Sequence, residues 1–305
     1  MRWQVRTAVG LFRRRQQFYF LHIPKTAGSS LGQALLSQYR PGEVLNCSVE
    51  DLLQLDLPQI RSRRAYCGHW GTGLYSLLDR PIRTFSVLRD PFDRVVSAIR
   101  YSQREGLPRE YPEIREVFAR GDWNEILHHS VISGLLENIQ CLYLGAKIDL
   151  CPHLASPPPS VTRSGEPLPS LEYQWAKQRR EGGLQWGELA AEAKGRLDQL
   201  EAVGIFEQLT ETTRSFCEPL GLRVPRALPE KRISPERRQA SHAGYRLSGE
   251  IPPDAARRID QLTTIDQELY DYARARFARQ LAERRRSYWP LWLTPFTRTV
   301  AAPGN

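Results

Sequence analysis

A lysine and three hydroxyl side chains gather in the segment HIPKTAGSS, residues 22–30, between an apolar run and a helical pattern. Small residues let a backbone approach an anion closely, and amides at the start of a helix point their N–H groups toward it. Lys25 adds a positive charge on a long stem. The segment predicts a phosphate-binding loop, and a plain capped turn is the competing interpretation. The residues expected to contact the phosphate are Lys25, Thr26, Ala27, Gly28, Ser29 and Ser30.

Arg89 and Ser97 have a spacing that suits a second phosphate, within FSVLRDPFDRVVSAIRY at residues 85–101. Arg89 ends an apolar strand pattern, and open α/β sheets bind ligands at the carboxyl ends of their strands. Ser97 lies about two turns into the helix that follows. A guanidinium fork and a hydroxyl together can hold a phosphate. In this segment alone, an ion pair of Arg89 with a neighbouring aspartate is an equally good interpretation.

His69 ends a short strand pattern in YCGHWGTG, residues 66–73, just before a glycine-rich turn. A histidine at a strand end that faces a cleft can act as a general base near neutral pH. A single histidine is more often structural, so the assignment of His69 as a base depends on the two segments described above.

The composition of the 305 residues is that of an ordinary globular protein, with 41% hydrophobic and 25% charged residues. The formal net charge of +9 favours an anionic partner, such as a nucleotide, a nucleic acid, an acidic glycan or a membrane surface. The charge does not choose among these partners. Part of it lies in the clusters Arg13–Arg15 and Arg284–Arg286, which we expect to be solvated.

Strand-like and helical patterns alternate along the chain, as in a parallel sheet covered by helices. Short runs of aromatic and β-branched residues indicate strands at Phe18–Ile23, Ala65–His69, Thr84–Leu88 and Glu201–Phe206. One helix is expected to begin at Ser29 and Ser30, which could cap it, and another at Asp90-Pro91. Further helices are expected at Val49–Ile60, Leu184–Leu200, Glu207–Leu220 and Pro253–Arg284.

These patterns divide the chain into three parts. We expect an N-terminal basic segment at residues 1–16, one large domain at 17–283, and an aromatic and basic tail at 284–305. Within the domain, residues 151–185 are rich in proline and serine and are expected to form a long loop or insertion. The tail could touch a membrane surface peripherally, but packing on the domain or on a partner subunit is the favoured interpretation.

Together, the three segments resemble the sulfotransferase superfamily that uses 3′-phosphoadenosine 5′-phosphosulfate (PAPS), and more narrowly its carbohydrate branch, which includes the heparan sulfate 2-O-sulfotransferases. The phosphosulfate loop of that family reads I/V-P-K-T-x-x-[ST]-[ST], and IPKTAGSS at residues 23–30 matches it. The 3′-phosphate site reads [IL]-R-D-P-x-x-R-x-x-S, and LRDPFDRVVS at residues 88–97 matches throughout. Gly68-His69 corresponds to the pair that holds the family's proposed base.

Weaker similarities extend the resemblance over about residues 17–277. They are ENIQCLYLGA at 137–146, LEAVGIFEQLTET at 200–212 and DQELYDYARARF at 266–277. The resemblance implies a P-loop-NTPase-like, three-layer α/β/α fold with a central, mostly parallel sheet. It also implies PAPS as co-substrate, 3′-phosphoadenosine 5′-phosphate (PAP) as product, and no metal.

The resemblance assigns each site residue a role. Lys25 would stabilise the leaving phosphate, and the loop from Thr26 to Ser30 would hold the 5′-phosphate. Arg89 and Ser97 would hold the 3′-phosphate, and His69 would take the proton from an acceptor hydroxyl. The acceptor would be a carbohydrate or another hydroxyl-bearing molecule.

The sequence departs from the family at positions that bear on the acceptor. Cys67 stands where the heparan enzymes have a further histidine, and residues 141–143 lack the Thr-Arg often seen there. Basic side chains outside the core could hold an acidic acceptor, although a solvated surface is the more common role for each. These side chains are Arg100, Arg104, Lys177, Arg179, Arg180, Lys231 and Arg232.

Three other functions fit parts of the pattern. An ordinary P-loop kinase or NTPase is one, but Lys25 precedes Gly28, whereas the Walker order places the lysine after a glycine. A non-catalytic binder of anionic glycans or nucleic acid is another, although no nucleic-acid motif appears. Cys67-x-His69 and Cys151-x-His153 could supply metal ligands, but their spacing is unlike common zinc modules.

The five cysteines are few and scattered, which favours a reducing compartment and argues against a disulfide scaffold. No stretch has the length of a transmembrane helix, and the N-terminal apolar run is too short for a signal peptide. We therefore expect a cytoplasmic protein that does not bind nucleic acid and that could form a homo-oligomer.

Overall fold

A computed structural model describes residues 16–105, 112–155, 185–228 and 251–288 of the chain. Five strands of the described residues form one sheet in the order β2-β3-β1-β4-β5, and every neighbouring pair is parallel. The strands are β1 (Phe18–Leu21), β2 (Val44–Leu45), β3 (Ala65–Gly68), β4 (Arg83–Leu88) and β5 (Ala202–Ile205). The central strand β1 lies between β3 and β4, so the chain crosses to one side of β1 and later to the other.

Two short 3₁₀ helices and fourteen α-helices occur in the described residues. The helices of the first half are α1 (Gly28–Leu36), η1 (Pro41–Glu43), α2 (Val49–Leu53), α3 (Leu57–Arg61), α4 (Leu74–Leu77), α5 (Pro91–Glu105), α6 (Pro112–Arg120), α7 (Trp123–His128), α8 (Ser130–Leu136), α9 (Ile139–Gly145) and α10 (Cys151–Ala155). Those that follow are α12 (Trp186–Gln199), η2 (Phe206–Gln208), α13 (Leu209–Leu220), α15 (Pro253–Leu262) and α16 (Thr264–Tyr288).

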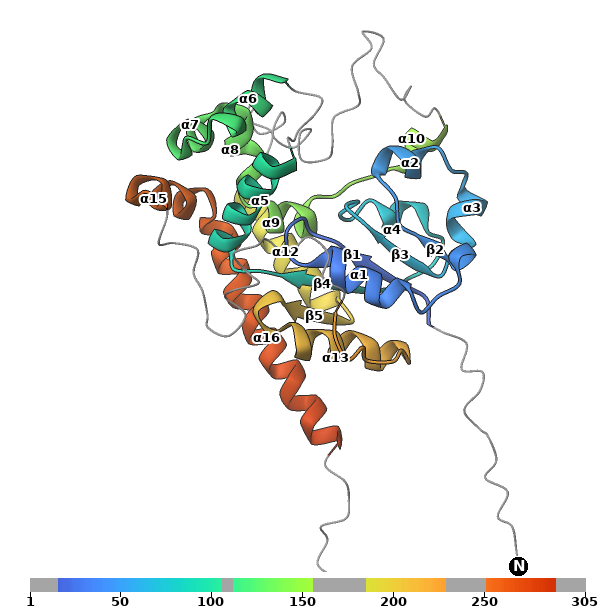
Figure 1. Ribbon diagram of the computed structural model, residues 1–305. Helices are drawn as coiled ribbons and strands as arrows, with labels where there is room; N and C mark the ends of the chain where they lie inside the picture. The colour runs from blue at the N-terminus through green and yellow to red at the C-terminus, as the bar shows by residue number, and fades with distance from the viewer. Residues whose placement is uncertain (1–15, 106–111, 156–184, 229–250, 289–305) are drawn as a thin grey trace, which may run out of the picture.

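The sheet is buried on both faces, which explains why β1 reads as a continuous apolar run. Side chains of a strand alternate between the faces, so Phe18 and Phe20 pack on one side with α1 and α13. Tyr19 and Leu21 pack on the other side with α9, α12 and α16. Figure 1 shows α1 and α13 on the near side of the sheet and α12 behind it. The expected three-layer α/β/α fold with a parallel sheet is therefore confirmed.

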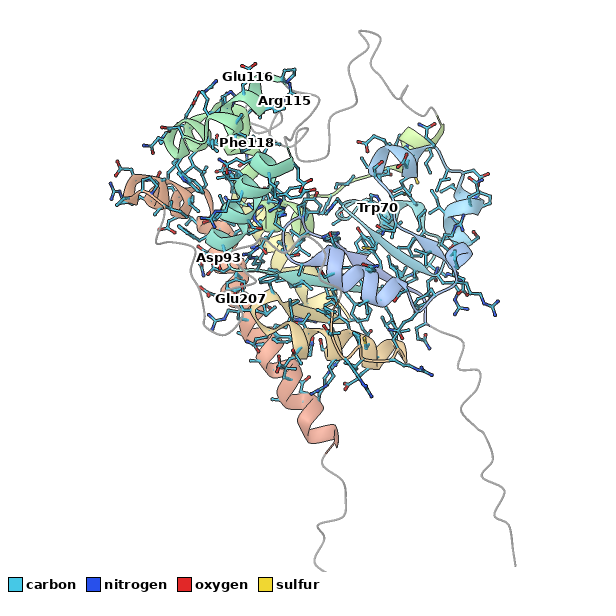
Figure 2. All side chains as sticks on the ribbon, viewed as in Figure 1. Trp70, Asp93, Arg115, Glu116, Phe118 and Glu207 are labelled. Carbon is cyan, nitrogen blue, oxygen red and sulfur yellow. The ribbon has the colours of Figure 1, made fainter. Side chains whose placement is uncertain are left out.

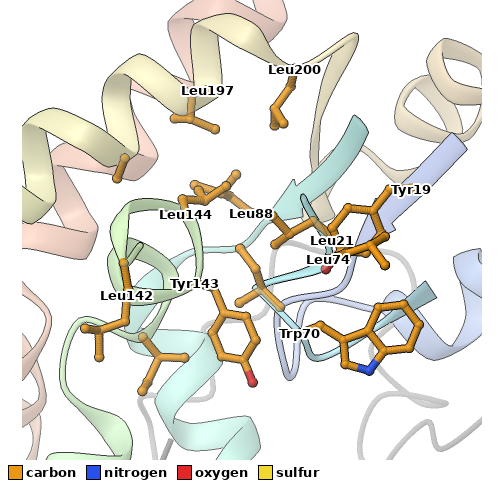
Figure 3. Close-up of a cluster of buried hydrophobic side chains, with 14 of the residues drawn as sticks. Tyr19, Leu21, Trp70, Leu74, Leu88, Leu142, Tyr143, Leu144, Leu197 and Leu200 are labelled. Carbon is orange, nitrogen blue, oxygen red and sulfur yellow. The ribbon is translucent and has the colours of Figure 1, made fainter. Parts of the chain in front are cut away.

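The larger core cluster joins the sheet to α9 and α12. Figure 3 shows Tyr19, Leu21 and Leu88 of the strands close to Leu144 of α9, with Leu197 of α12 above them. The helices approach closely at Gly145, where an added Cβ would come within 2.3 Å of the Leu189 carbonyl oxygen. A glycine at this position lets the two helix backbones pack together.

A separate helical unit lies to one side of the sheet. Helices α5, α6, α7, α8 and α15 share a third hydrophobic cluster, which includes Val95, Ile126 and Ile259. Sequence patterns predicted α5 but not the helices between Pro112 and Leu136, which are short and cover little of the sheet.

Two of the predicted helices are each divided in two. The expected helix Val49–Ile60 is α2 and α3, because Asp56 caps α3 in a reciprocal capping box with Gln59, and Pro58 occupies its first turn. The expected helix Pro253–Arg284 is α15 and α16, with the break at Thr263. The prediction of single helices was wrong at both places.

Arg284 does not belong to a simply solvated cluster, as the sequence had suggested. Its Nη2 donates to the Ser215 carbonyl at 2.6 Å, and its Nη1 lies 3.3 Å from Glu218 of α13. Helix α16 continues to Tyr288, beyond the expected end of the domain at residue 283. The N-terminal segment, most of the Pro-rich insertion and the tail after Tyr288 lie outside the described residues, so their predicted roles stay predictions.

The five cysteines all lie in the described part of the chain, and all are free thiols. Burial raises the pKa of the Cys67 thiol to about 12 and contributes most to the rise of the Cys47 thiol to about 11. Among the described helices, none is long and apolar enough to cross a membrane.

Candidate active site

The loop after β1 turns sharply into α1. Lys25 and Ala27 both have left-handed backbones, with φ of 71° and 67°, and Ala27 is the N-cap of the helix. Ser29 and Ser30 therefore lie inside the first turn, and the expectation that they cap the helix was wrong. The first amides of a helix have no carbonyl partner one turn back, so those of Gly28 and Ser29 can donate to an anion.

The interior of this loop is fixed by contacts of its own. Thr26 is fully buried, and its hydroxyl donates to the Ile23 carbonyl at 2.9 Å. The Ser30 amide donates to the Ala27 carbonyl at 3.1 Å. A Cβ at Gly28 would lie 1.8 Å from the His22 ring, so only glycine fits there. These contacts leave the amides of Gly28 and Ser29, rather than the Thr26 hydroxyl, as the groups that could face a phosphate.

Arg89 brings the second predicted segment to this loop. It is the first residue after β4, its side chain is buried, and its Nη1 donates to the Lys25 carbonyl at 3.2 Å. Its guanidinium also lies 4.4 Å from the ring centre of Phe206, which follows β5. The arginine and the predicted phosphate-binding loop therefore meet at the carboxyl edge of the sheet, as the sequence predicted.

Gln140 holds the backbone of Arg89 in place. Its side-chain oxygen accepts from the Arg89 amide and its side-chain nitrogen donates to the Arg89 carbonyl, both at 2.9 Å. Gln140 is fully buried at the start of α9. One amide side chain thus satisfies both backbone groups of the residue that ends β4, as a neighbouring strand would.

Helices α9 and α16 cap each other beneath Gln140. The Asp266 carboxylate accepts from the amides of Gln140 at 3.1 Å and Cys141 at 2.7 Å. In return, the Asn138 side-chain oxygen accepts from the amides of Ile265 and Asp266. Burial raises the pKa of Asp266 to about 6, although the nearby Arg94 and these amides oppose the rise. The two helix starts therefore form one buried polar network that supports Arg89.

Glu207 connects the residue after Arg89 to helix α16 at the same edge of the sheet. One carboxylate oxygen accepts from the Asp90 amide at 3.1 Å, and the other accepts from the Tyr270 hydroxyl at 2.6 Å. Figure 2 shows Glu207 near Asp93, at the start of α5. Burial and the Glu207 carboxylate raise the pKa of Tyr270. Arg89 is thus flanked by residues fixed to α9 on one side and to α16 on the other.

Lys25 contacts helix α5, and Ser97 lies on it. The Lys25 Nζ lies 3.7 Å from the ring centre of Tyr101, a cation–π contact that the sequence did not predict. Ser97 is half-buried on α5, about 9 Å along the helix from its start at Pro91. Lys25, Arg89 and Ser97 all lie on or against β4 and α5. The two predicted phosphate sites are therefore connected through one strand–helix unit.

His69 follows β3, the strand that pairs with β1 on the side opposite to β4. Its side chain is exposed just after β3, and its Nδ1 lies 2.8 Å from the His22 carbonyl oxygen. A carbonyl can only accept, so Nδ1 carries the proton and Nε2 is left as the basic nitrogen of the neutral ring. The His22 and His69 ring centres are 4.1 Å apart. The structure therefore gives His69 the tautomer that a general base at Nε2 requires.

The structure also shows where residues considered for other functions lie. The Asp90 carboxylate accepts from the Asp93 amide and so caps α5, which is a structural use of the acidic group that follows β4. Among the described side chains, no group of three or more His, Cys, Asp and Glu residues could hold a metal ion. Of the basic residues considered for an acidic acceptor, Arg100 and Arg104 lie on α5, and the remaining five lie outside the described residues.

No protein-family model matches the chain, and no curated protein matches its sequence. Among solved structures, the chain is similar to the crystal structure of a sulfotransferase from Alicyclobacillus acidocaldarius, at 15% sequence identity and a TM-score of 0.36. The alignment covers 85% of this chain and 98% of that chain. The fold class given above rests on this chain's own sheet and helices.

Proposed function

We propose that the chain is a sulfotransferase that transfers a sulfuryl group from PAPS to a hydroxyl of a carbohydrate or glycan-like acceptor. The observation that carries the proposal is the contact between the Arg89 guanidinium and the Lys25 carbonyl, with His69 on the other side of β1. In this proposal, two anion-binding groups and a base surround the end of one strand. The match of both nucleotide motifs to the family pattern supports PAPS as the donor.

The two phosphates of the donor would bind to different parts of the site. The first-turn amides of Gly28 and Ser29, with the Lys25 ammonium, suit the 5′-phosphosulfate. The Arg89 fork and the Ser97 hydroxyl suit the 3′-phosphate, which ATP lacks. A buried guanidinium that lies against Phe206, on a backbone held by Gln140, is pre-organised for such an anion.

The transfer would place the acceptor oxygen, the sulfur and the leaving phosphate oxygen in line. His69 Nε2 takes the acceptor proton while the new oxygen–sulfur bond forms. The sulfur–oxygen bond to the phosphate breaks, and its electron pair stays on the phosphate oxygen of PAP. Lys25 and the loop amides neutralise this developing charge. In this proposal, the chain's own groups supply both the base and the electrostatic stabilisation.

Nucleotide binding is the first test. PAP should raise the thermal unfolding temperature of the full chain, since a ligand at a hundred times its Kd adds about 2.7 kcal/mol of stability. Adenosine 5′-monophosphate should bind more weakly, and an Arg89→Lys variant should lose most of the preference for PAP. Stabilisation by Mg-ATP and not by PAP would reject the sulfotransferase proposal in favour of a kinase or NTPase.

Catalysis is the second test, with labelled PAPS, an acceptor library and product mass as the readout. His69→Ala should lower kcat by about 10²–10⁴-fold, as expected for loss of a general base, and Lys25→Ala by about 10²–10³-fold. His128→Ala and Lys147→Ala are matched controls, because both side chains are exposed and remote from the site. Glycan binding without transfer by the wild type would favour a non-catalytic binder.

A further inference from the structure

A groove of about 860 Å³ follows α1 on the side of β3. Its lining includes Gly28 and Ser29 at the start of the helix and Tyr39 and Pro41 beyond its end. With nine residues, α1 is about 14 Å long, which is enough for two or three sugar units. A volume of this size is typical of small-ligand sites.

The groove reaches the proposed reacting atoms from the side opposite to Arg89. His69 and Gly68 of β3 line it together with His22, so the exposed imidazole of the proposed base opens into it. Arg89 follows β4, on the other side of β1. A donor held by Arg89 and the loop would therefore leave this groove open for the second substrate.

The described lining of the groove is uncharged, although a quarter of the whole chain is charged. Among the described residues that line it, none is Asp, Glu, Lys or Arg. Apart from Pro41, its exposed side chains are uncharged hydrogen-bonding groups: Ser29, Gln33, Ser37, Asn46 and His69. Amide and hydroxyl groups of this kind pair well with sugar hydroxyls, and an anion would lose its hydration without gaining a countercharge.

Two carboxylates lie beyond the lining at the Cys47 end of the groove. Burial, and to a smaller extent the carboxylates of Asp51 and Glu50, raise the pKa of the Cys47 thiol to about 11. These two acidic residues lie in the first turn of α2, just past the groove wall. Their field disfavours a carboxylate or a sulfate group at this end of the groove.

We propose that this groove binds the acceptor, and that the acceptor is an uncharged, hydroxyl-rich molecule such as a neutral sugar chain. The inference rests on the proposed sulfotransferase function and narrows its substrate class. It excludes the acidic acceptor that the chain's net positive charge alone would favour.

The test uses the full chain, PAPS, and two panels of oligosaccharides matched in length, one neutral and one containing uronic acid. Sulfate transfer should be confined to the neutral panel. Gln33→Trp should fill the groove, raise the acceptor KM at least tenfold and leave PAP affinity unchanged. Gln261→Trp is the matched control, since Gln261 is an exposed glutamine on α15, away from the groove.

The possible outcomes distinguish a failure of this inference from a failure of the proposed sulfotransferase function. Transfer to the uronate panel alone, or a Gln33→Trp enzyme with a normal acceptor KM, would overturn the neutral-acceptor groove while the sulfotransferase function stands. PAP binding with no transfer to any neutral acceptor would also overturn it. Failure to bind PAP at all would overturn the proposed function, and the inference with it.

Discussion

Replacing Gln140 by leucine tests whether one buried side chain holds the arginine of the site. The change keeps the side-chain volume nearly constant but removes two 2.9 Å hydrogen bonds to the Arg89 backbone. A buried backbone group that loses its partner costs about 1–3 kcal/mol, so two such groups give a loss of about 3–4 kcal/mol. For a chain of this size, that loss lowers the unfolding temperature by roughly 10 °C.

Urea unfolding monitored by circular dichroism gives the free energy, and titration calorimetry gives the PAP affinity. The variant should lose at least tenfold in PAP affinity at a temperature where it is fully folded, because the Arg89 backbone is no longer fixed. Gln261→Leu on the surface is the control, with an expected change below about 0.5 kcal/mol. If Gln140→Leu were no less stable than this control, the idea that Gln140 substitutes for a neighbouring strand would be refuted.

Three further changes probe other parts of the site. Gly28→Ala should destabilise the chain by about 1–3 kcal/mol in thermal unfolding, because its Cβ meets an imidazole, whereas Gly42→Ala meets nothing within 4 Å and should be neutral. Burial raises the pKa of Asp266 to about 6, so the native state binds the extra proton between about pH 4 and 6, and the unfolding free energy falls as pH rises through that window. Asp266→Asn should remove about 3 kcal/mol of this pH dependence in urea unfolding, and parallel profiles for the two proteins would contradict the assignment. Tyr101→Leu should lower kcat about fivefold with PAP affinity unchanged, because the ring positions Lys25 through a contact of about 1 kcal/mol. Tyr101→Phe keeps the ring and should keep full activity. An equal loss of kcat in both variants would argue against the ring contact.

The strands and the residues at their ends were predictable because their signals are local. Apolar runs marked β1, β3, β4 and β5 to within about two residues. His69 and Arg89 directly follow β3 and β4, and Lys25 lies in the loop after β1. Parallel strands bring their carboxyl ends to one edge, so the sequence also predicted that these side chains would meet. The short β2 was missed, because two residues carry no periodicity.

The side chains that brace the site were not predictable in the same way. Phe206, Tyr101 and Gln140 act on residues far away in sequence, and nothing in their own neighbourhoods indicates those partners. Family-like phrases contained Gln140 and Glu207, but they gave no role for either residue. The break at Thr263 has the same origin, since the cap that starts α16 comes from Asn138.

The split of Val49–Ile60 is a different case, because its signal was present in the sequence. Asp56 and Gln59 have the spacing of a capping box, and Pro58 suits the first turn of a new helix. The apolar leucines on either side continued the helical spacing and masked this boundary. Local capping signals outweighed periodicity there, whereas at Ser29 and Ser30 the left-handed Ala27 outweighed the capping preference of serine.

The reciprocal caps of α9 and α16 set the order in which a newly made chain can mature. Asp266 lies 126 residues after Gln140, so the ribosome must synthesise nearly the whole chain before the two can meet. Until then the first amides of α9 lack the Asp266 carboxylate. Gln140, which holds the end of β4, is then not supported by α16. The proposed nucleotide site is therefore completed only when α16 has been made, and a chain that stops before α16 should keep the strands and loops of the site without its rigidity.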